Sequence, residues 1–372
     1  MKKRLFVARD IRGSGLLFAA GIATGLVLAS KMVSTSQLPV LALCSVTASG
    51  AFLFLRGEKI PARMAALLTG AAFFFCGLFC SLNSSTLTLS LGDTAEGLPG
   101  KAVEALRREI DSIGFPSASS GALVKALLTG DKSGLPPGII EVFRESGASH
   151  ILALSGLHLG IIYLIISKIT KPIGNSVIAV AARFTITVGA ALFYTVMTGA
   201  SPSIVRAFLF IALGETAKIL HRSVSPARTL FCALTLQLAM KPSSMMTVGF
   251  QLSYLAMVGI FFLFPFLSDI YPRAGNPRLD SFNLPRKIWD AASLSISCQA
   301  LTGPLAWHYF HSFPKYFILT NLIALPLTSV TMALSVATIT LSFMGICPHV
   351  IILLDDKALQ ALVFCLEVIS GM

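Results

Sequence analysis

Ser155 and His158 stand three residues apart in a long apolar stretch, a spacing that places both side chains on one face of a helix. A histidine beside a serine could accept the hydroxyl proton and turn the oxygen into a nucleophile, as in a hydrolase. The sequence has no Gly-x-Ser-x-Gly turn and no suitably placed acid to complete such a site. We therefore favour a role in lining a polar path or in bonding helices together, and expect no catalytic residue and no enzyme.

Several other polar residues also interrupt apolar stretches. A charged side chain at the centre of a bilayer costs about 2.5–3.5 kcal/mol, so Arg206 should face a wet cavity or a partner, or extend to the outer headgroups. Each neutral residue alone could simply bond neighbouring helices, but together they favour a water-filled path. The predicted path residues are His150, Ser155, His158, Arg206, Gln251, Ser253, Gln299 and Asn321.

Metal and cofactor chemistry find no support in the sequence. The seven cysteines all lie in apolar stretches and none forms a Cys-x-x-Cys pair, so we interpret them as small packing residues. The run Gly130-Asp131-Lys132-Ser133 lacks the first glycine of a phosphate-binding loop. We expect no metal, no cofactor and no nucleotide hydrolysis by this chain.

The elements that carry these residues are membrane helices. Of the 372 residues 55% are hydrophobic and 12% are charged, about half the charge usual in a soluble domain. A bilayer core needs about 20 apolar residues per helix. We predict an all-α polytopic membrane protein with ten or eleven spans, the longest of which could bend or break at Pro326. The spans lie near 13–31, 38–55, 62–82, 149–167, 175–198, 204–220, 228–240, 248–267, 289–310 and 316–346, with a possible last one near 357–370.

The net charge of +12 is explained by topology. With the N-terminus in the cytoplasm, 17 basic residues lie in cytoplasmic segments, whereas the short outer connections hold only Lys31, Lys241 and Lys315. This bias is the positive-inside rule, and it predicts a multi-pass protein of the bacterial cytoplasmic membrane. The first apolar run could instead be a cleaved signal peptide, but Arg9 and Arg12 crowd it and favour an uncleaved helix.

One long segment, 83–148, falls on the outer side between predicted N-terminal helices (1–82) and a membrane channel domain (149–372). Apolar residues recur at helical spacing over 101–113, over 119–129 and from Ile139 to about residue 147. Gly130 suits the end of the second of these helices. We expect three amphipathic helices on the outer face, acting either as a structural lid or in gating. The proposed lid motif is Gly130, Asp131, Lys132 and Ser133.

The residues from Leu127 to Gly160 form a long signature, LLTGDKSGLPPGIIEVFRESGASHILALSGLHLG. This run resembles the ComEC-type competence channel family, whose pattern it matches at four successive places. The four places are Gly130-Asp131-Lys132-Ser133, Phe143, Ser146-Gly147-Ala148-Ser149-His150 and Ser155-Gly156-Leu157-His158. Two later stretches, 199–207 with Arg206 and 249–254, resemble further motifs of that family, so the resemblance covers roughly 120–346.

The resemblance implies a channel for the inward passage of single-stranded DNA across the cytoplasmic membrane during natural transformation. It also implies a DNA receptor on the outer face and a DNA-handling or motor protein in the cytoplasm, and leaves the oligomeric state open. Many members add an oligonucleotide-binding barrel and a metallo-β-lactamase-type nuclease domain. The segment 83–148 is too short for that barrel, and no His-x-His-x-Asp-His cluster is present, so we expect the channel core alone.

Two alternatives stay open at this point. Prolines within late spans, Pro304 and Pro326, would suit the broken helices of a secondary transporter for ions or small solutes, although no internal repeat is apparent. A non-conducting scaffold of a DNA-uptake complex is the third hypothesis. Deleting the gene and scoring transformation separates the channel from the transporter. Complementation by point mutants in the polar residues separates the channel from the scaffold.

Overall fold

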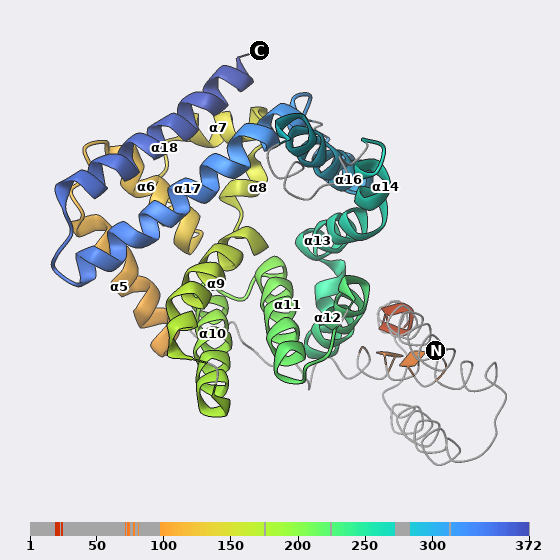
Figure 1. The fold of residues 1–372 in the computed structure, drawn as a ribbon. Helices are drawn as coiled ribbons and strands as arrows, with labels where there is room; N and C mark the ends of the chain where they lie inside the picture. The colour runs from red at the N-terminus through yellow and green to blue at the C-terminus, as the bar shows by residue number, and fades with distance from the viewer. Residues whose placement is uncertain are drawn as a thin grey trace, which may run out of the picture. The chain divides into compact units, whose positions relative to one another are not determined.

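The fold is known from a computed structural model that describes residues 97–371 apart from 175, 224, 272–282 and 312–313, together with a few positions among the first 96. Within these residues every regular element is a helix and no strand occurs (Figure 1). This confirms the predicted all-α class. The three spans expected near 13–31, 38–55 and 62–82 lie almost wholly outside the described residues.

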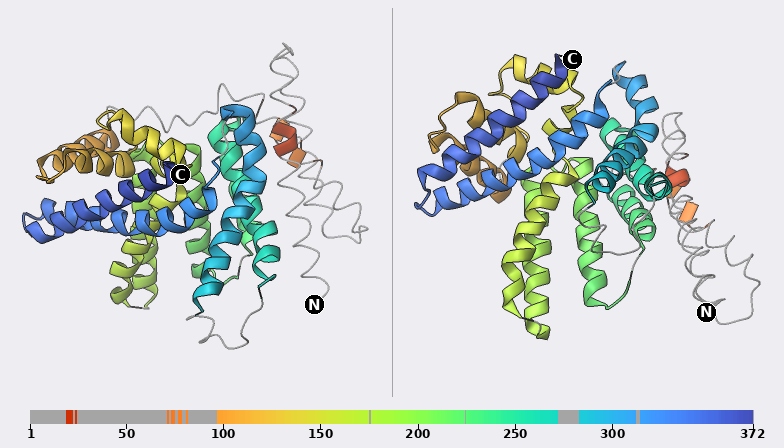
Figure 2. Two further views of the ribbon diagram at one scale, coloured as in Figure 1. Left: turned by 90° about the horizontal axis from the view of Figure 1, so that it is seen from above. Right: turned by 45° about the horizontal axis from the view of Figure 1, so that its top comes forward.

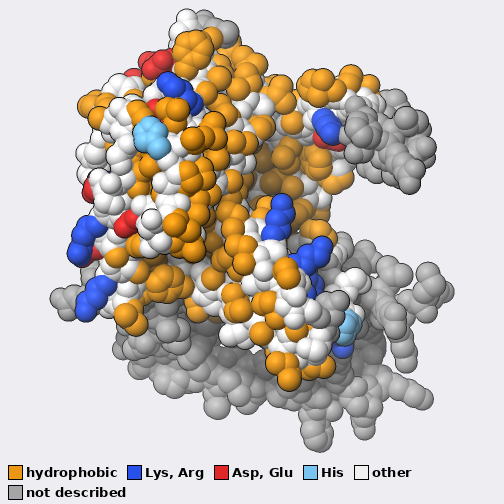
Figure 3. All heavy atoms as spheres, turned by 60° about the vertical axis from the view of Figure 1, so that its left-hand side comes forward, with side chains coloured by type: hydrophobic (Ala, Val, Ile, Leu, Met, Phe, Trp, Pro, Cys, Tyr) orange, Lys and Arg blue, Asp and Glu red, His pale blue; other side chains and the backbone are white. Residues whose placement is uncertain are grey.

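Among the residues that the structure describes, four helical stretches are long and apolar enough to cross a membrane: Gly156–Ile173, Val177–Met197, Val248–Ser268 and Phe317–Phe343. The third of these consists of α13 (Val248–Val258), the π-helix η5 (Gly259–Leu263) and α14 (Phe264–Ser268). Hydrophobic side chains predominate on the face drawn in Figure 3, where charged ones are few. The described part of the chain is therefore that of a helical membrane protein.

The chain divides into two compact units, one of residues 1–90 and 209–251 and the other of residues 91–208 and 252–372. The division passes through α11 (Pro202–Ile219) and α13. The first unit also contains α12 (Pro226–Met240) and the short η4 (Pro242–Met246). The second unit contains almost all the signature residues and is the one that positions the candidate site.

A long hairpin organises the core of the second unit. Helices α17 (Phe317–Phe343) and α18 (His349–Ser370) run side by side, as the views in Figures 1 and 2 agree. Against them pack α5 (Leu98–Ser112), α6 (Ala118–Thr129) and α7 (Pro137–Glu145), which are the three expected amphipathic helices.

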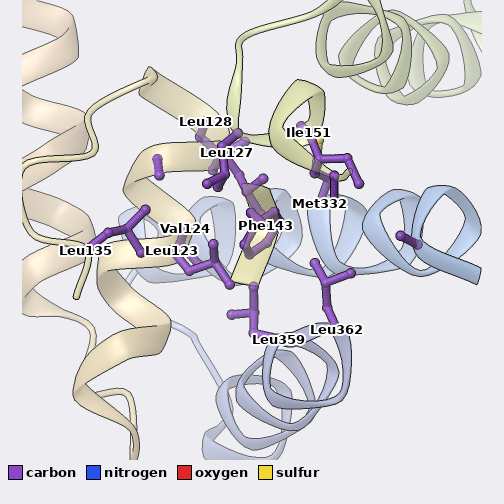
Figure 4. Close-up of a cluster of buried hydrophobic side chains, with 14 of the residues drawn as sticks. Leu123, Val124, Leu127, Leu128, Leu135, Phe143, Ile151, Met332, Leu359 and Leu362 are labelled. Carbon is purple, nitrogen blue, oxygen red and sulfur yellow. The ribbon is translucent and has the colours of Figure 1, made fainter. Parts of the chain in front are cut away.

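The apolar faces of these five helices meet in one cluster, part of which is shown in Figure 4. Phe143 of α7 is fully buried among leucines of α6 and α18 and Met332 of α17. Burying a side chain of this size contributes about 1.5–3 kcal/mol. The amphipathic helices are thus built into the core of the second unit, with their apolar stripes against the α17–α18 hairpin.

Helices α16 (Leu284–Phe310) and α17 contain prolines, and α18 is the last helix of the chain's described part. Helices α16 and α17 continue through Pro304 and Pro326, so the helix does not break at Pro326. A proline inside a membrane helix is tolerated because neighbouring groups satisfy the freed carbonyl oxygen. The last helix, α18, begins at His349, eight residues earlier than the possible span near 357–370. It is not one of the four spanning stretches, because it carries three charged residues in succession, Asp355, Asp356 and Lys357.

Candidate functional site

The helix that was predicted to run unbroken over 149–167 is in fact two helices. A single turn, α8 (Ser149–Leu152), is followed by three non-helical residues, and α9 (Gly156–Thr170) then begins. His150 and His158 therefore lie on different helices. The break has a local cause, because Ser155 has the extended backbone of a helix N-cap and Gly156 is a poor residue for a helix interior.

Ser155 and His158 together cap the start of α9. The hydroxyl oxygen of Ser155 accepts from the N–H of Leu157 at 3.3 Å. His158 Nδ1 accepts from the N–H of Ser155 at 3.2 Å, and it lies 2.9 Å from the serine hydroxyl. This reciprocal arrangement is a capping box, with histidine in the position more often held by Glu or Gln. The spacing that suggested a nucleophile and its base is thus accounted for by helix capping.

The capping arrangement fixes the state of the histidine ring. Because Nδ1 accepts a hydrogen bond, the neutral ring carries its proton on Nε2. His158 is 1% exposed, and its Nε2 atom has no hydrogen-bond partner among the residues that the structure describes. The start of α9 therefore presents a buried donor that none of the described residues accepts.

Two glycines of the signature hold the segments around this break close together. Gly130 ends α6 with a φ of 77°, and a Cβ there would come within 2.6 Å of a Leu154 methyl carbon in the break. Gly147 has a φ of 80°, and a Cβ there would overlap the ring of Pro314 before α17. Both positions combine a left-handed backbone with a close neighbour, so only glycine fits them.

The predicted lid motif is a hydrogen-bonded turn attached to α5. Asp131 accepts from the hydroxyl of Ser133 at 2.7 Å and from its backbone N–H at 3.0 Å, and its second oxygen lies 3.3 Å from Arg107 Nε. The bonds from Ser133, and then the charge of Arg107, lower the pKa of Asp131. Lys132 is exposed. This geometry gives the motif a structural role, and a role in gating stays a prediction.

Arg206 lies in the second turn of α11, inside the second unit, near the start of α9. Its guanidinium carbon lies 5.7 Å from the centre of the Tyr254 ring, within the range of a cation–π contact. Its Nη1 atom is buried without a hydrogen-bond partner, and no carboxylate pairs with it, in the part of the chain that the structure describes. The next residue, Ala207, has its Cβ only 3.3 Å from where a Cβ on Gly156 would lie.

The other predicted path residues are not gathered at this point. His150 is exposed and its ring bonds the carbonyl oxygen of Gly147. Gln251, in the first unit, donates to the carbonyl oxygen of Met245 at 3.0 Å. Ser253 and Asn321 are partly buried on α13 and α17. The structure thus joins Ser155 with His158, and Arg206 with Tyr254, but does not make one cluster of the eight.

Gln299 belongs to a separate, open groove on α16. The groove has a volume of about 540 Å³ and is also lined by Gly303, Pro304, Trp307 and Phe317. Its walls are mainly apolar, so Gln299 is its main polar group. Cys298, the preceding residue, lies near Arg206. No group of three or more His, Cys, Asp or Glu that could hold a metal ion occurs within the described ranges.

Sequence reasoning missed Tyr254 as a site residue. It stands at the end of the second later motif, Gly249-Phe250-Gln251-Leu252-Ser253-Tyr254, and an aromatic residue in a membrane helix is usually read as packing. The available signal was Arg206, a charged residue in an apolar stretch, which calls for a polar or aromatic partner. A tyrosine or tryptophan face provides one.

Comparisons with known proteins identify a family for this chain. The "Competence protein" family model matches residues 127–372, about two thirds of the chain. ComE operon protein 3 of Bacillus subtilis (strain 168) is 25% identical over 230 residues, covering 60% of this chain and 27% of that protein. Competence protein ComA of Neisseria gonorrhoeae is 30% identical over 152 residues, covering 40% and 22%. An uncharacterized protein of Aquifex aeolicus (strain VF5) is 28% identical over 222 residues, covering 54% and 51%.

The chain therefore spans between about a fifth and a half of the length of these relatives. No solved structure shows a significant match. The matched region begins at Leu127, where the signature begins, and it includes both the capped break and Arg206. A family of competence proteins points to a role in DNA uptake. Since the family model covers well over half of its residues, this membrane protein belongs to the competence protein family.

Proposed function

We propose that this chain provides a path for the inward passage of single-stranded DNA across the bacterial cytoplasmic membrane during natural transformation. The observation that carries the proposal is Arg206, a charged side chain with a buried, unpartnered Nη1 atom beside the start of a broken helix. A cation left without a carboxylate in such surroundings is costly, and an anionic substrate would offset that cost.

The chemistry of the site fits a phosphate group. A guanidinium presents several N–H donors in a plane that suits the oxygens of a phosphate. The start of α9 adds a partial positive charge, because the peptide dipoles of a helix point that way. Ser155 already satisfies part of that helix end, so Arg206 supplies the main attraction and the helix start supplements it.

Tyr254 supports the same interpretation. Its ring contacts the guanidinium without neutralising it, so the charge stays available to a passing anion. A carboxylate in that place would hold the arginine in an ion pair and compete with phosphate. A path for a polyanion requires attraction that is weak enough for release, and one unpaired arginine meets this requirement better than a cluster of them.

The remaining parts of the proposal rest on the topology and the family. The N-terminus lies in the cytoplasm, a receptor delivers DNA at the outer face, and a cytoplasmic DNA-handling or motor protein receives the strand. The chain performs no catalysis itself. The activity of the longer relatives as whole proteins is part of the proposal and no more, because the chain spans only part of them.

The test replaces Arg206 in the full-length protein in its own host. Arg206→Gln removes the charge and Arg206→Lys keeps it, while Arg144→Gln removes an exposed arginine that pairs with Glu141 on α7. A lost charge-assisted hydrogen bond is worth about 1.5–3 kcal/mol, so transformation should fall roughly ten- to hundredfold in the Gln variant at equal membrane levels. The Lys variant should keep much of it, and the Arg144 variant all of it.

A secondary transporter for small anions has one observation in its favour, the broken α8–α9 segment, since broken helices line the binding sites of many transporters. Deletion of the gene distinguishes the two functions. Loss of transformation with unchanged solute uptake supports DNA passage, and the reverse result supports the transporter. A non-conducting scaffold predicts that the Arg206→Gln variant transforms normally.

A further inference from the structure

Two adjacent carboxylates, Asp355 and Asp356, are fully buried on α18. They lie beside the hydrophobic core of the second unit. Leu359 and Leu362 continue the same face of α18, and Met332 and Ile339 belong to the same core on α17. Aspartate is almost never fully buried unless it is paired. The two carboxylates differ in how far their surroundings satisfy them.

Asp356 is accounted for by its hydrogen bonds. One oxygen accepts from the hydroxyl of Ser120 at 2.6 Å and from the backbone N–H of Ser117 at 3.3 Å. The other accepts from the amide of Gln360 at 2.8 Å. Ser117 is the N-cap of α6, so Asp356 caps that helix from more than 230 residues away. These bonds occupy both oxygens of the Asp356 carboxylate.

Asp355 has no comparable set of partners. Its Oδ1 accepts from the hydroxyl of Ser335 on α17 at 2.9 Å. Its Oδ2 is buried and has no hydrogen-bond partner among the residues described. An ionised carboxylate with one oxygen unsatisfied in an apolar core is strongly disfavoured, whereas the neutral acid is not.

No basic group within the described ranges offsets a negative charge at this position. Helix α17 has no ionisable residue at all, and the titratable neighbours of Asp355 are Asp356 and Cys347. Helices α6 and α7 also pack against α18. The charged residue of α6 is Lys125, which pairs with Asp111. On α7, Arg144 pairs with Glu141, and Glu145 is exposed. Lys357 on α18 itself bonds Gln360. In the described part of the chain Asp355 has no ion-pair partner.

From this arrangement we infer that Asp355 is a proton-binding site, which takes up and releases a proton on α18 against the hydroxyl of Ser335. Uptake leaves a neutral acid that fits the core, and release leaves an unpaired carboxylate that the α17–α18 packing accommodates poorly. Burial raises the pKa of Asp355 to about 6, although the hydroxyls of Ser335 and Thr338 act to lower it. The exchange therefore falls in mildly acidic solution. The inference stands apart from DNA passage and can be tested without DNA.

A proton suits the site better than a metal ion does. A metal ion needs room and several oxygen ligands, commonly six or more for a hard divalent cation. Here leucine and methionine side chains share the surroundings, and the nearby hydroxyls are already donors, Ser335 to Asp355 and Thr338 to the carbonyl oxygen of Leu334. A proton needs no such space.

The direct test is infrared difference spectroscopy on the purified full-length protein in detergent, between about pH 5 and about pH 8. A carbonyl band of a protonated carboxyl should be present at the lower pH, shift in heavy water and disappear at the higher pH. Asp355→Asn should remove that band, and Asp356→Asn should leave it in place. A spectrum with no such band, or one that survives in the Asp355→Asn protein, would overturn the inference.

Thermal unfolding gives a second measurement. A folded-state pKa raised above the unfolded value gives stability that is complete below the unfolded pKa and lost as the pH rises through the folded pKa. The amide of Asp355→Asn mimics the neutral acid, so that variant serves as the reference. Between about pH 5 and about pH 8, the melting temperature of the wild type should fall by roughly 2–5 °C more than that of the variant. If the melting temperatures of the two proteins change equally with pH, the inference is overturned. DNA uptake does not enter this measurement and tests only the proposed function.

Discussion

The hydroxyl of Thr320 donates to the carbonyl oxygen of Ser146 at 2.7 Å, joining residues that are 174 positions apart. Thr320 is in the first turn of α17, and Ser146 ends α7 within the family signature. Both residues are fully buried. The signature is therefore anchored directly on the hairpin that organises the second unit, and changes in either segment should be felt in the other.

Gly147, the neighbour of Ser146, gives the sharpest test of this anchoring. Gly147→Ala places a Cβ on a left-handed backbone and against Pro314, so we expect a loss of about 1–3 kcal/mol in stability. The measurement is the thermal unfolding of the purified protein. Gly138→Ala is the matched control, because that glycine lies within α7 with open space around it and alanine should be neutral or slightly stabilising.

Capping of α9 predicts which replacements of Ser155 are tolerated. Ser155→Ala removes the side-chain acceptor and should cost about 0.5–2 kcal/mol, whereas Ser155→Asn keeps one and should be close to wild type in both stability and transformation. A nucleophilic serine would behave differently, since asparagine would abolish its activity. Normal stability but no transformation in the Asn variant would contradict the capping account.

The contact of Tyr254 with Arg206 predicts a graded response in transformation. Tyr254→Phe keeps an aromatic face under the guanidinium, and Tyr254→Leu removes it. A cation–π contact away from water is worth up to about 2 kcal/mol, so the Leu variant should transform up to roughly thirtyfold less well. The Phe variant should lie much nearer to the wild type. Equal transformation by both variants, at equal membrane levels, would show that the ring does not position the arginine.

The turn at Asp131 should make stability depend on pH in acid. A pKa lowered in the folded state contributes stability that is present above the unfolded pKa, near 4, and lost as the pH falls through the folded value. Asp131→Asn should therefore be less stable than the wild type by about 1 kcal/mol at neutral pH, a modest cost because the side chain is partly exposed. The difference should shrink below about pH 4 in a series of unfolding measurements. A constant difference would mean that Asp131 acts through shape and not through its charge.

Periodicity and end signals were enough to predict the amphipathic helices. The expected helices over 101–113 and 119–129 correspond to α5 and α6, and Gly130 has the left-handed backbone of a C-cap. The break before Gly156 was missed because Leu152, Ala153 and Leu154 keep the run apolar, and hydropathy does not register a cap. The signal was present, since a serine followed three residues later by a side chain able to bond back is the pattern of a capping box.

Long-range burial was beyond the reach of sequence patterns. Asp355, Asp356 and Lys357 in succession suggest an exposed stretch, yet both aspartates are fully buried. Asp356 is buried because it caps α6, a pairing across more than 230 residues that no local pattern reveals. The approach of Arg206 to Tyr254 is similar, since it depends on how α11 and α13 meet. The site residues could be nominated from the sequence, but their partners could not.

The most direct test of the proposed DNA path is to measure the labelled DNA strand that reaches the cytoplasm, relative to DNA bound at the cell surface, in cells carrying Arg206→Gln or Arg206→Lys. The account predicts unchanged surface binding in both variants. It predicts a fall of roughly ten- to hundredfold in the internal strand for the Gln variant and substantial recovery for the Lys variant. Equal internal DNA in wild type and the Gln variant, at equal membrane levels, would contradict it.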